Sequence, residues 1–199
     1  MASTAVELLR RRFGGKKGIL PQGYTQLNYI ENTGNACIFI TKTMPFKIEL
    51  EFAPDLDFII SGYGCMFGFD SNFQAAFAGN GKANIGNAIS SATFFSDNVR
   101  TNVKCYLSSV KTQTYYYVND SDTGLTRAST TTSWVLFAAT SSGSHPARGK
   151  MYSFKMWNDN NELIMNLIPC IDPNNIYGMY DVINDVFYSS NTSTPFIGG

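Results

Sequence analysis

Apolar and polar residues alternate over short stretches along most of this chain. The clearest case is residues 46–52, Phe-Lys-Ile-Glu-Leu-Glu-Phe, in which every second residue is apolar and the residues between them are charged. A period of two residues places the apolar side chains on one face of a β-strand and the charged ones on the other. Further strands are predicted over residues 24–31, 36–40, 73–78, 82–85, 99–107, 112–118, 134–139, 149–157 and 162–168.

Turn-forming residues separate these stretches. Gly79-Asn80-Gly81 joins two predicted strands, and Asn-Gly is a strong signal for a hairpin with a type I′ turn. Residues 62–64, 119–122 and 159–161 are read as further turns. Many short strands with no helical pattern between them predict an all-β domain, a two-sheet antiparallel jelly-roll sandwich over residues 20–199.

Residues 1–19 follow a different pattern. Thr4 and Glu7 have the spacing of a helix capping box, and Gly14-Gly15 is a helix stop signal. A short N-terminal helix is therefore predicted over residues 5–13, with its apolar residues on one side. Because so short a helix is not stable alone in water, we expect residues 1–19 to be a docking helix and hinge.

Charge is divided unevenly between this segment and the rest. Lys and Arg number 15 in the whole chain, as do Asp and Glu, which gives a net charge of zero. Residues 1–17 hold five basic residues and one acidic residue, a net of +4, so the remainder carries −4. A segment that is both basic and apolar favours a groove on a partner protein over nucleic acid or a membrane. The predicted docking residues are Val6, Leu9, Arg10, Arg11, Arg12, Phe13, Lys16 and Lys17.

Composition excludes several classes of protein. Charged residues make up 15% of the chain, hydrophobic residues 44% and aromatic residues 14%, which argues against disorder and against a general nucleic-acid binder. The N-terminus lacks the apolar core of a secretory signal, and no apolar run approaches the length of a membrane span. We therefore expect a protein that is not secreted through a signal peptide and does not enter a membrane.

The sequence predicts no metal site and no cofactor. No two of the four cysteines have the spacing of a zinc site, and each of the first three lies in an apolar strand context, which predicts buried free thiols. The Asp-x-Asp pairs at residues 55–57 and 120–122 offer too few oxygens for Ca²⁺ and are interpreted as turns. The cysteines are Cys37, Cys65, Cys105 and Cys170.

Two features have residue types that could serve in catalysis, a pair of glutamates on one strand and a single histidine. Glu49 and Glu51 share one face of a strand, as the carboxylates of a retaining glycosidase do, but Pro54 stands where the motif Glu-x-Asp-x-x-Glu has its last carboxylate. An alternating polar outer face explains the pair. The single histidine, His145, lies in a Ser/Gly-rich loop that offers no buried acid, and we interpret it as a surface residue. We therefore expect no enzymatic activity.

The strongest binding feature is an aromatic stripe in residues 112–119. Its even positions fit a core face, whereas its odd positions combine tyrosines with amides. By the same parity Trp157 shares a face with Ser153 and Lys155, opposite Tyr152. Such rings suit stacking on sugars and equally suit packing or a contact between subunits. The candidate contact residues are Gln113, Tyr115, Tyr117, Asn119 and Trp157.

Both ends of the predicted sandwich contain sequence motifs that match a known domain family. Residues 20–34, Leu-Pro-Gln-Gly-Tyr-Thr-Gln-Leu-Asn-Tyr-Ile-Glu-Asn-Thr-Gly, and residues 149–157, Gly-Lys-Met-Tyr-Ser-Phe-Lys-Met-Trp, are two of these motifs. Residues 167–170 and 178–181, with Asn184 and Phe187-Tyr188, complete them. The chain thereby resembles the concanavalin A-like (LamG-like) jelly-roll domain of virion proteins of gut Bacteroides-type bacteriophages and of gut-bacterial surface proteins.

The resemblance implies a role as well as a fold. It implies a non-enzymatic bacteriophage virion protein, a head fibre or capsid-decoration protein, held on the particle by residues 1–17 and displaying a lectin-like domain. Assembly in the bacterial cytoplasm, a homo-oligomer, and contacts with other virion proteins and with host or mucosal glycans would follow. The alternatives are a tail-associated host-attachment lectin that binds surface polysaccharide and, more remotely, a polysaccharide hydrolase.

Overall fold

The computed structural model describes residues 20–41, 46–58, 62–69, 73–85, 88–107, 113–127 and 133–199. The predicted docking helix and the apolar and basic docking residues on it lie outside the described residues. Within the described residues, helical structure is limited to Gly62 and the 3₁₀ turns η1 (Leu56–Phe58) and η3 (Gly79–Gly81). None of it is long and apolar enough to cross a membrane.

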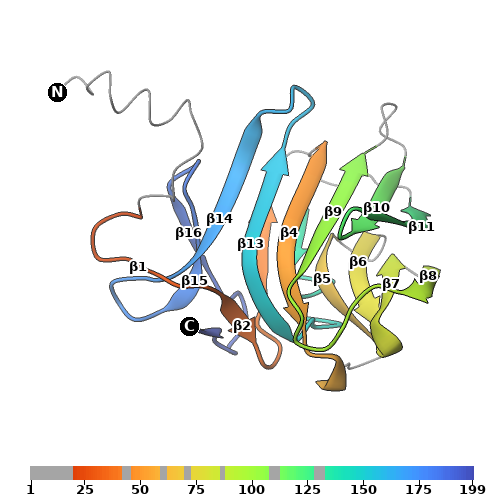
Figure 1. Ribbon diagram of the computed structural model, residues 1–199. Helices are drawn as coiled ribbons and strands as arrows, with labels where there is room; N and C mark the ends of the chain where they lie inside the picture. The colour runs from red at the N-terminus through yellow and green to blue at the C-terminus, as the bar shows by residue number, and fades with distance from the viewer. Residues whose placement is uncertain are drawn as a thin grey trace.

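The larger of two antiparallel sheets has eleven strands (Figure 1). Its main path runs in the order β11-β10-β9-β4-β13-β14-β15-β16, while β1 pairs with β14, β2 with β13, and β17 with β2. Its strands are β1 (Thr25–Gln26), β2 (Ile30–Asn32), β4 (Lys47–Pro54), β9 (Thr101–Leu107), β10 (Thr114–Val118), β11 (Ser121–Arg127), β13 (Gly149–Trp157), β14 (Leu163–Ile171), β15 (Tyr177–Asp181), β16 (Val186–Ser189) and β17 (Ile197–Gly198).

The smaller sheet has six strands in the order β3-β12-β5-β6-β7-β8 and lies behind the larger one in Figure 1. Its strands are β3 (Ile38–Thr41), β5 (Tyr63–Phe69), β6 (Phe73–Ala78), β7 (Lys82–Ile85), β8 (Ala88–Thr93) and β12 (Ser133–Leu136). Two antiparallel sheets packed face to face confirm the predicted all-β sandwich.

Aromatic side chains from both sheets fill the space between them. The ring of Phe52 on β4 lies 5.9 Å from that of Phe77 on β6, and the ring of Phe67 on β5 lies 6.1 Å from that of Phe154 on β13. All four rings are buried. Burial of such large apolar groups is the main favourable term in folding, and the inward positions of β4 supply it as the alternation predicts.

Several strands match the predictions closely. β13 has the predicted bounds, β4 buries Ile48, Leu50 and Phe52 as expected, and β6 and β7 form the predicted hairpin. The residues predicted as one strand over 24–31 form β1 and β2 instead. The break occurs because the chain changes partners there: the N–H of Leu27 donates to the carbonyl of Pro169, and those of Asn28 and Tyr29 to the carbonyl of Gly199.

Two turn predictions were wrong in detail, whereas the turn predicted at residues 119–122 is present between β10 and β11. The β6–β7 hairpin has a three-residue loop, because Ala78 pairs with Lys82, rather than a two-residue type I′ turn. Positive φ angles at both residues of a two-residue turn occur instead at Asn119 and Asp120, after which β11 begins at once. Of the turn predicted at residues 62–64, only Gly62, with a φ of +81°, lies outside β5, which begins at Tyr63.

The four cysteines are buried free thiols, as predicted. Removal from water disfavours the charged thiolate, so burial raises the pKa of each, in Cys170 to about 12. The thiols therefore stay protonated and pack as small apolar groups.

The loop of residues 137–148, between β12 and β13, covers part of the outer face of the smaller sheet. Ala138 packs with Cys37 and Val135, and Ala139 packs with Cys65 and Ala76, all of them buried. The outer face of the larger sheet, by contrast, carries aromatic and charged side chains that are partly exposed.

Candidate functional site

The candidate site is the outer face of β10, β9, β4 and β13, which lie side by side at the front of Figure 1; we call it the outer sheet face. Inward residues of these strands are buried and outward ones partly exposed, so alternation separates core from surface. The outward residues are Tyr115, Tyr117, Asn102, Lys104, Tyr106, Lys47, Glu49, Glu51, Lys150, Tyr152, Ser153, Lys155 and Trp157.

An aromatic row crosses one end of this face. Trp157 is paired with Lys47, Lys47 with Tyr106, and Tyr106 with Tyr115, so the row spans four strands and about 14 Å at the usual strand spacing. The Nζ atom of Lys47 lies 3.6 Å from the centroid of the Trp157 ring. The rings of Tyr106 and Tyr117 meet edge to face with centroids 5.6 Å apart, so Tyr117 joins the row.

The structure brings three of the five predicted contact residues onto this one face. Tyr115, Tyr117 and Trp157 are all partly exposed there, and β10 buries its even positions as predicted. Gln113 is exposed just before β10. Asn119 instead belongs to the β10–β11 turn, where its Oδ1 accepts the N–H of Asn102 at 2.9 Å, so its amide has a structural role.

The carboxylates of Glu49 and Glu51 point outward on β4 as predicted, and both are held by neighbouring side chains. Glu49 lies 3.8 Å from Lys47 and accepts a hydrogen bond from Asn102 at 3.3 Å, while Glu51 forms an ion pair with Arg100. The residue at the last carboxylate position of the glycosidase motif, Pro54, is buried. The arrangement is that of a polar strand face whose two β4 carboxylates are paired.

A third ion pair joins β9 to the β10–β11 turn. The Lys104 ammonium is hydrogen-bonded to the Asp120 carboxylate, and this bond raises the pKa of Lys104 above its ordinary value. The first Asp-x-Asp pair lies at the 3₁₀ turn η1, where Asp55 Oδ1 accepts the N–H of Asp57. In the second pair Asp120 belongs to the β10–β11 turn, but Asp122, whose Oδ1 accepts the N–H of Gly124, already lies in β11. The described residues contain no group of His, Cys, Asp or Glu side chains that could hold a metal ion.

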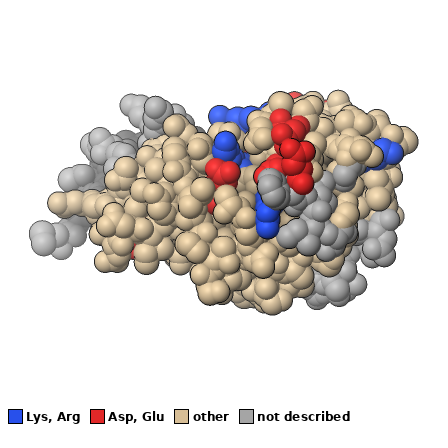
Figure 2. Space-filling view, turned by 90° about the horizontal axis from the view of Figure 1, so that it is seen from below, with Lys and Arg blue, Asp and Glu red and all other residues tan. Residues whose placement is uncertain are grey.

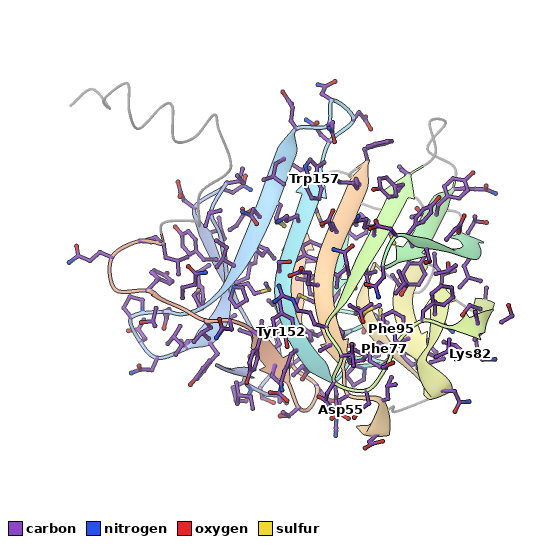
Figure 3. The ribbon with its side chains drawn as sticks, viewed as in Figure 1. Asp55, Phe77, Lys82, Phe95, Tyr152 and Trp157 are labelled. Carbon is purple, nitrogen blue, oxygen red and sulfur yellow. The ribbon has the colours of Figure 1, made fainter. Side chains whose placement is uncertain are left out.

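Tyr152 was predicted to face away from Trp157, and that prediction was wrong. The pairing of β13 with β4 shifts between Met151 and Ser153, so Tyr152 is the extra residue of a β-bulge and points outward. Its ring lies 5.8 Å from that of Tyr29, and the guanidinium of Arg100 lies 4.3 Å from its centroid. Figure 3 shows Tyr152 and Trp157 towards opposite ends of β13. Strict alternation could not have found this bulge.

His145 was read as a surface residue in a loop tip, and the structure corrects that reading. Its ring is half-buried and stacks on that of Tyr63, with centroids 4.8 Å apart and an interplanar angle of 7°. Its carbonyl accepts the N–H of Cys65. This histidine fastens the covering loop to β5, and it lies on the smaller sheet, away from the outer sheet face.

Comparisons with known proteins bear on the fold. No family model matches the chain, and no curated protein matches it. Among solved structures it is similar to a candidate carbohydrate-binding protein from Bacteroides ovatus, with a TM-score of 0.54 and 11% identity over 87% of this chain and 60% of that one. The sandwich is a jelly roll. A further similar structure is the heptameric SAP-like pentraxin of Limulus polyphemus, with a TM-score of 0.42, 11% identity, and coverage of 88% and 91%.

At 11% identity the likeness to the Bacteroides protein shows the jelly-roll fold alone. The chain spans 60% of the length of the Bacteroides protein. The fold implied by the sequence resemblance is confirmed, whereas its bacteriophage context stays a prediction.

Seen from below, most of the jelly roll's surface is uncharged, and its charged side chains gather towards the upper middle of the view (Figure 2).

Proposed function

We propose that this chain is a non-enzymatic, saccharide-binding jelly-roll protein whose ligand lies on the outer sheet face. The aromatic row of Trp157, Tyr106, Tyr115 and Tyr117 carries the proposal, because it places four partly exposed rings across neighbouring strands. The C–H faces of sugars pack on aromatic rings, while hydroxyl groups bond to the polar side chains beside them. The carbohydrate-binding description of the Bacteroides protein supports the same reading.

Binding without catalysis fits the state of the carboxylates. A retaining glycosidase needs one carboxyl group free to attack and another poised to donate a proton. On this face Glu51 is paired with Arg100, and Glu49 with Lys47 and Asn102. These pairs favour a passive binding surface over a hydrolytic one.

Two substitutions test the aromatic row. Trp157→Ala and Tyr117→Ala each remove a ring that would contact sugar, and we expect each to lower the affinity for a glycan found by array screening about tenfold, equivalent to about 1.4 kcal/mol. Phe39→Ala on β3 is the control, since Phe39 is exposed on the other sheet and should leave affinity unchanged. Calorimetric titration measures the affinities, and circular dichroism checks the fold. Unchanged binding in both variants would refute the site.

A second part of the proposal concerns attachment. We propose that the protein is a bacteriophage virion component, a head fibre or capsid-decoration protein, with a tail-associated lectin as the alternative. What favours this setting is the net charge of +4 on residues 1–17, beside their apolar positions and the sequence resemblance of residues 20–34 and 149–157. Other virion proteins would hold this segment, and the jelly roll would be displayed as a homo-oligomer.

The attachment is tested by reversing charge in the N-terminal segment. Arg10→Glu, Arg11→Glu and Arg12→Glu together should prevent the protein from co-sedimenting with particles, while its glycan affinity is unchanged. Immunogold electron microscopy of particles carrying the natural chain then separates a head position from a tail position. Full incorporation of the triple variant would exclude these arginines from docking.

A further inference from the structure

Strand β13 contains the same tripeptide pattern twice. Lys150-Met151-Tyr152 and Lys155-Met156-Trp157 both read Lys-Met-aromatic, five residues apart. In a regular strand an odd separation would send the two copies to opposite faces of the sheet. The lysine and the aromatic residue of one copy would then point into the core.

The β-bulge at Tyr152 instead keeps both copies of the pattern on the same face of the sheet. Met151 pairs with Phe52 and Ser153 with Glu51, so Tyr152 is an additional residue that resets the alternation. Both Met151 and Met156 are fully buried, whereas both Lys–aromatic pairs are partly exposed on the outer sheet face. The bulge therefore creates two equivalent pairs on one surface, about 16 Å apart at the usual rise per residue.

Cations accompany the rings at both positions. Lys47 lies over Trp157 at 3.6 Å, and Arg100 lies over Tyr152 at 4.3 Å. The Nζ atom of Lys150 is 5.0 Å from the centroid of Tyr29, the ring that neighbours Tyr152. Each end of β13 thus combines an aromatic surface with positive charge.

These cations differ in whether their charge is balanced. Lys47, Arg100 and Lys104 each form an ion pair, with Glu49, Glu51 and Asp120 respectively. Lys150 and Lys155 form no ion pair with any described residue. The two lysines that form no ion pair are the ones in the repeated tripeptide. Glu31 lies opposite Lys150 on β2, and Glu49, which is already paired with Lys47, lies opposite Lys155 on β4. One lysine free of an ion pair thus lies beside each ring.

We infer that the ligand of the outer sheet face is an anionic polysaccharide, whose extended chain lies along β13 from Tyr152 to Trp157 and continues from Trp157 across the aromatic row. Each Lys would pair with a carboxylate or sulfate of the chain, and each ring would pack on an adjoining sugar. Two subsites about 16 Å apart require an oligosaccharide rather than a single sugar. The inference rests on the proposed saccharide-binding function and specifies its ligand class.

Single-stranded nucleic acid also combines negative charge with flat rings. It is the less favoured ligand, because three of the five cations on or beside this face are already neutralised and the chain has no net charge. A nucleic-acid channel tracks the backbone with a continuous positive surface. Nucleic acid is therefore an outcome to be tested, not the proposal.

The experiment measures binding of the full chain to defined probes by calorimetry and biolayer interferometry. The anionic probes are polygalacturonate, alginate and chondroitin sulfate; the neutral ones are fully methyl-esterified pectin and dextran, and (dT)30 represents nucleic acid. We expect an anionic polysaccharide to bind at least about tenfold more tightly than either neutral probe. Lys150→Gln and Lys155→Gln should each weaken that binding about two- to fivefold, as expected for one exposed ion pair. Lys82→Gln on β7 of the other sheet is the matched control and should change nothing.

The possible results distinguish failure of the anionic-ligand inference from failure of the proposed saccharide-binding function. If a neutral probe binds best, and its affinity falls in Trp157→Ala but not in the lysine variants, the anionic ligand is excluded while the saccharide site stands. If (dT)30 binds more tightly than every polysaccharide, the ligand class is nucleic acid and both proposals fail. If no anionic probe binds but a neutral glycan found by array screening does, the anionic ligand is excluded while the saccharide site stands; if no glycan binds at all, both fail.

Discussion

The hydroxyl group of Tyr116 links the two sheets, and its removal offers a direct test of the packing. Tyr116 lies on β10 of the larger sheet and is fully buried. Its hydroxyl donates a hydrogen bond of 3.1 Å to the carbonyl of Ala76 on β6 of the smaller sheet. Tyr116→Phe deletes this one bond and keeps the ring in place.

The expected cost follows from the burial of that bond. A buried hydrogen bond between neutral groups contributes about 0.5–1.5 kcal/mol of net stability. For a domain of this length, about 1 kcal/mol lowers the melting temperature by roughly 2–4 °C. Because the ring still fills its site, no cavity term is added, and the denaturant m-value should not change.

Urea unfolding followed by tryptophan fluorescence, with thermal unfolding alongside, measures the effect. Tyr115→Phe is the control: it removes the same atom from the neighbouring residue of β10, whose ring is partly exposed on the outer sheet face. We expect it to change stability by less than about 0.5 kcal/mol. A loss for Tyr115→Phe as large as that for Tyr116→Phe would refute the role of the inter-sheet bond.

Two further predictions concern the backbone and the thiols. Gly81 and Gly124 have φ angles of +68° and +70°, but a Cβ at Gly81 would lie 1.9 Å from the Phe95 carbonyl oxygen, whereas at Gly124 it would meet open space. Both alanine variants should lose about 1–3 kcal/mol from the left-handed backbone, and thermal unfolding should show the larger loss for Gly81→Ala; equal losses would contradict the close approach. Burial raises the pKa of Cys65 and Cys105 above the ordinary 9.0, so the free energy of unfolding should be unaffected by these thiols below pH 9 and should fall above it, where only the unfolded chain ionises. Urea titrations from pH 7 to 10.5 check this, and a flat profile would refute it.

Local pattern predicted several of the strands that have one covered face. In β4, charged residues separate the buried Ile48, Leu50 and Phe52, and in β10 the parity of Tyr115 and Tyr117 is as predicted. β5 was missed because neither of its faces is free: Cys65 and Met66 are both fully buried. A strand covered on both sides has no alternation to read. The loop that covers its outer face comes from residues far along the chain.

The candidate site was predictable only in part. The outward tyrosines of β10 and Trp157 were identified from parity, but their common surface depends on β9 and β4 lying between them. Lys47 and Tyr106 complete the row because of strand order, which no local signal encodes. Their cross-strand register with Trp157 and Tyr115 is a property of the assembled sheet.

The sequence by itself determined the all-β character, the buried thiols and the inward and outward positions of regular strands, because each depends on neighbours only one or two residues away. The tertiary structure alone decided the strand order and the bulge at Tyr152. A bulge inserts one residue relative to the partner strand, so it exists only through the pairing of β13 with β4. That pairing turns the two Lys–aromatic repeats of β13 towards the same side.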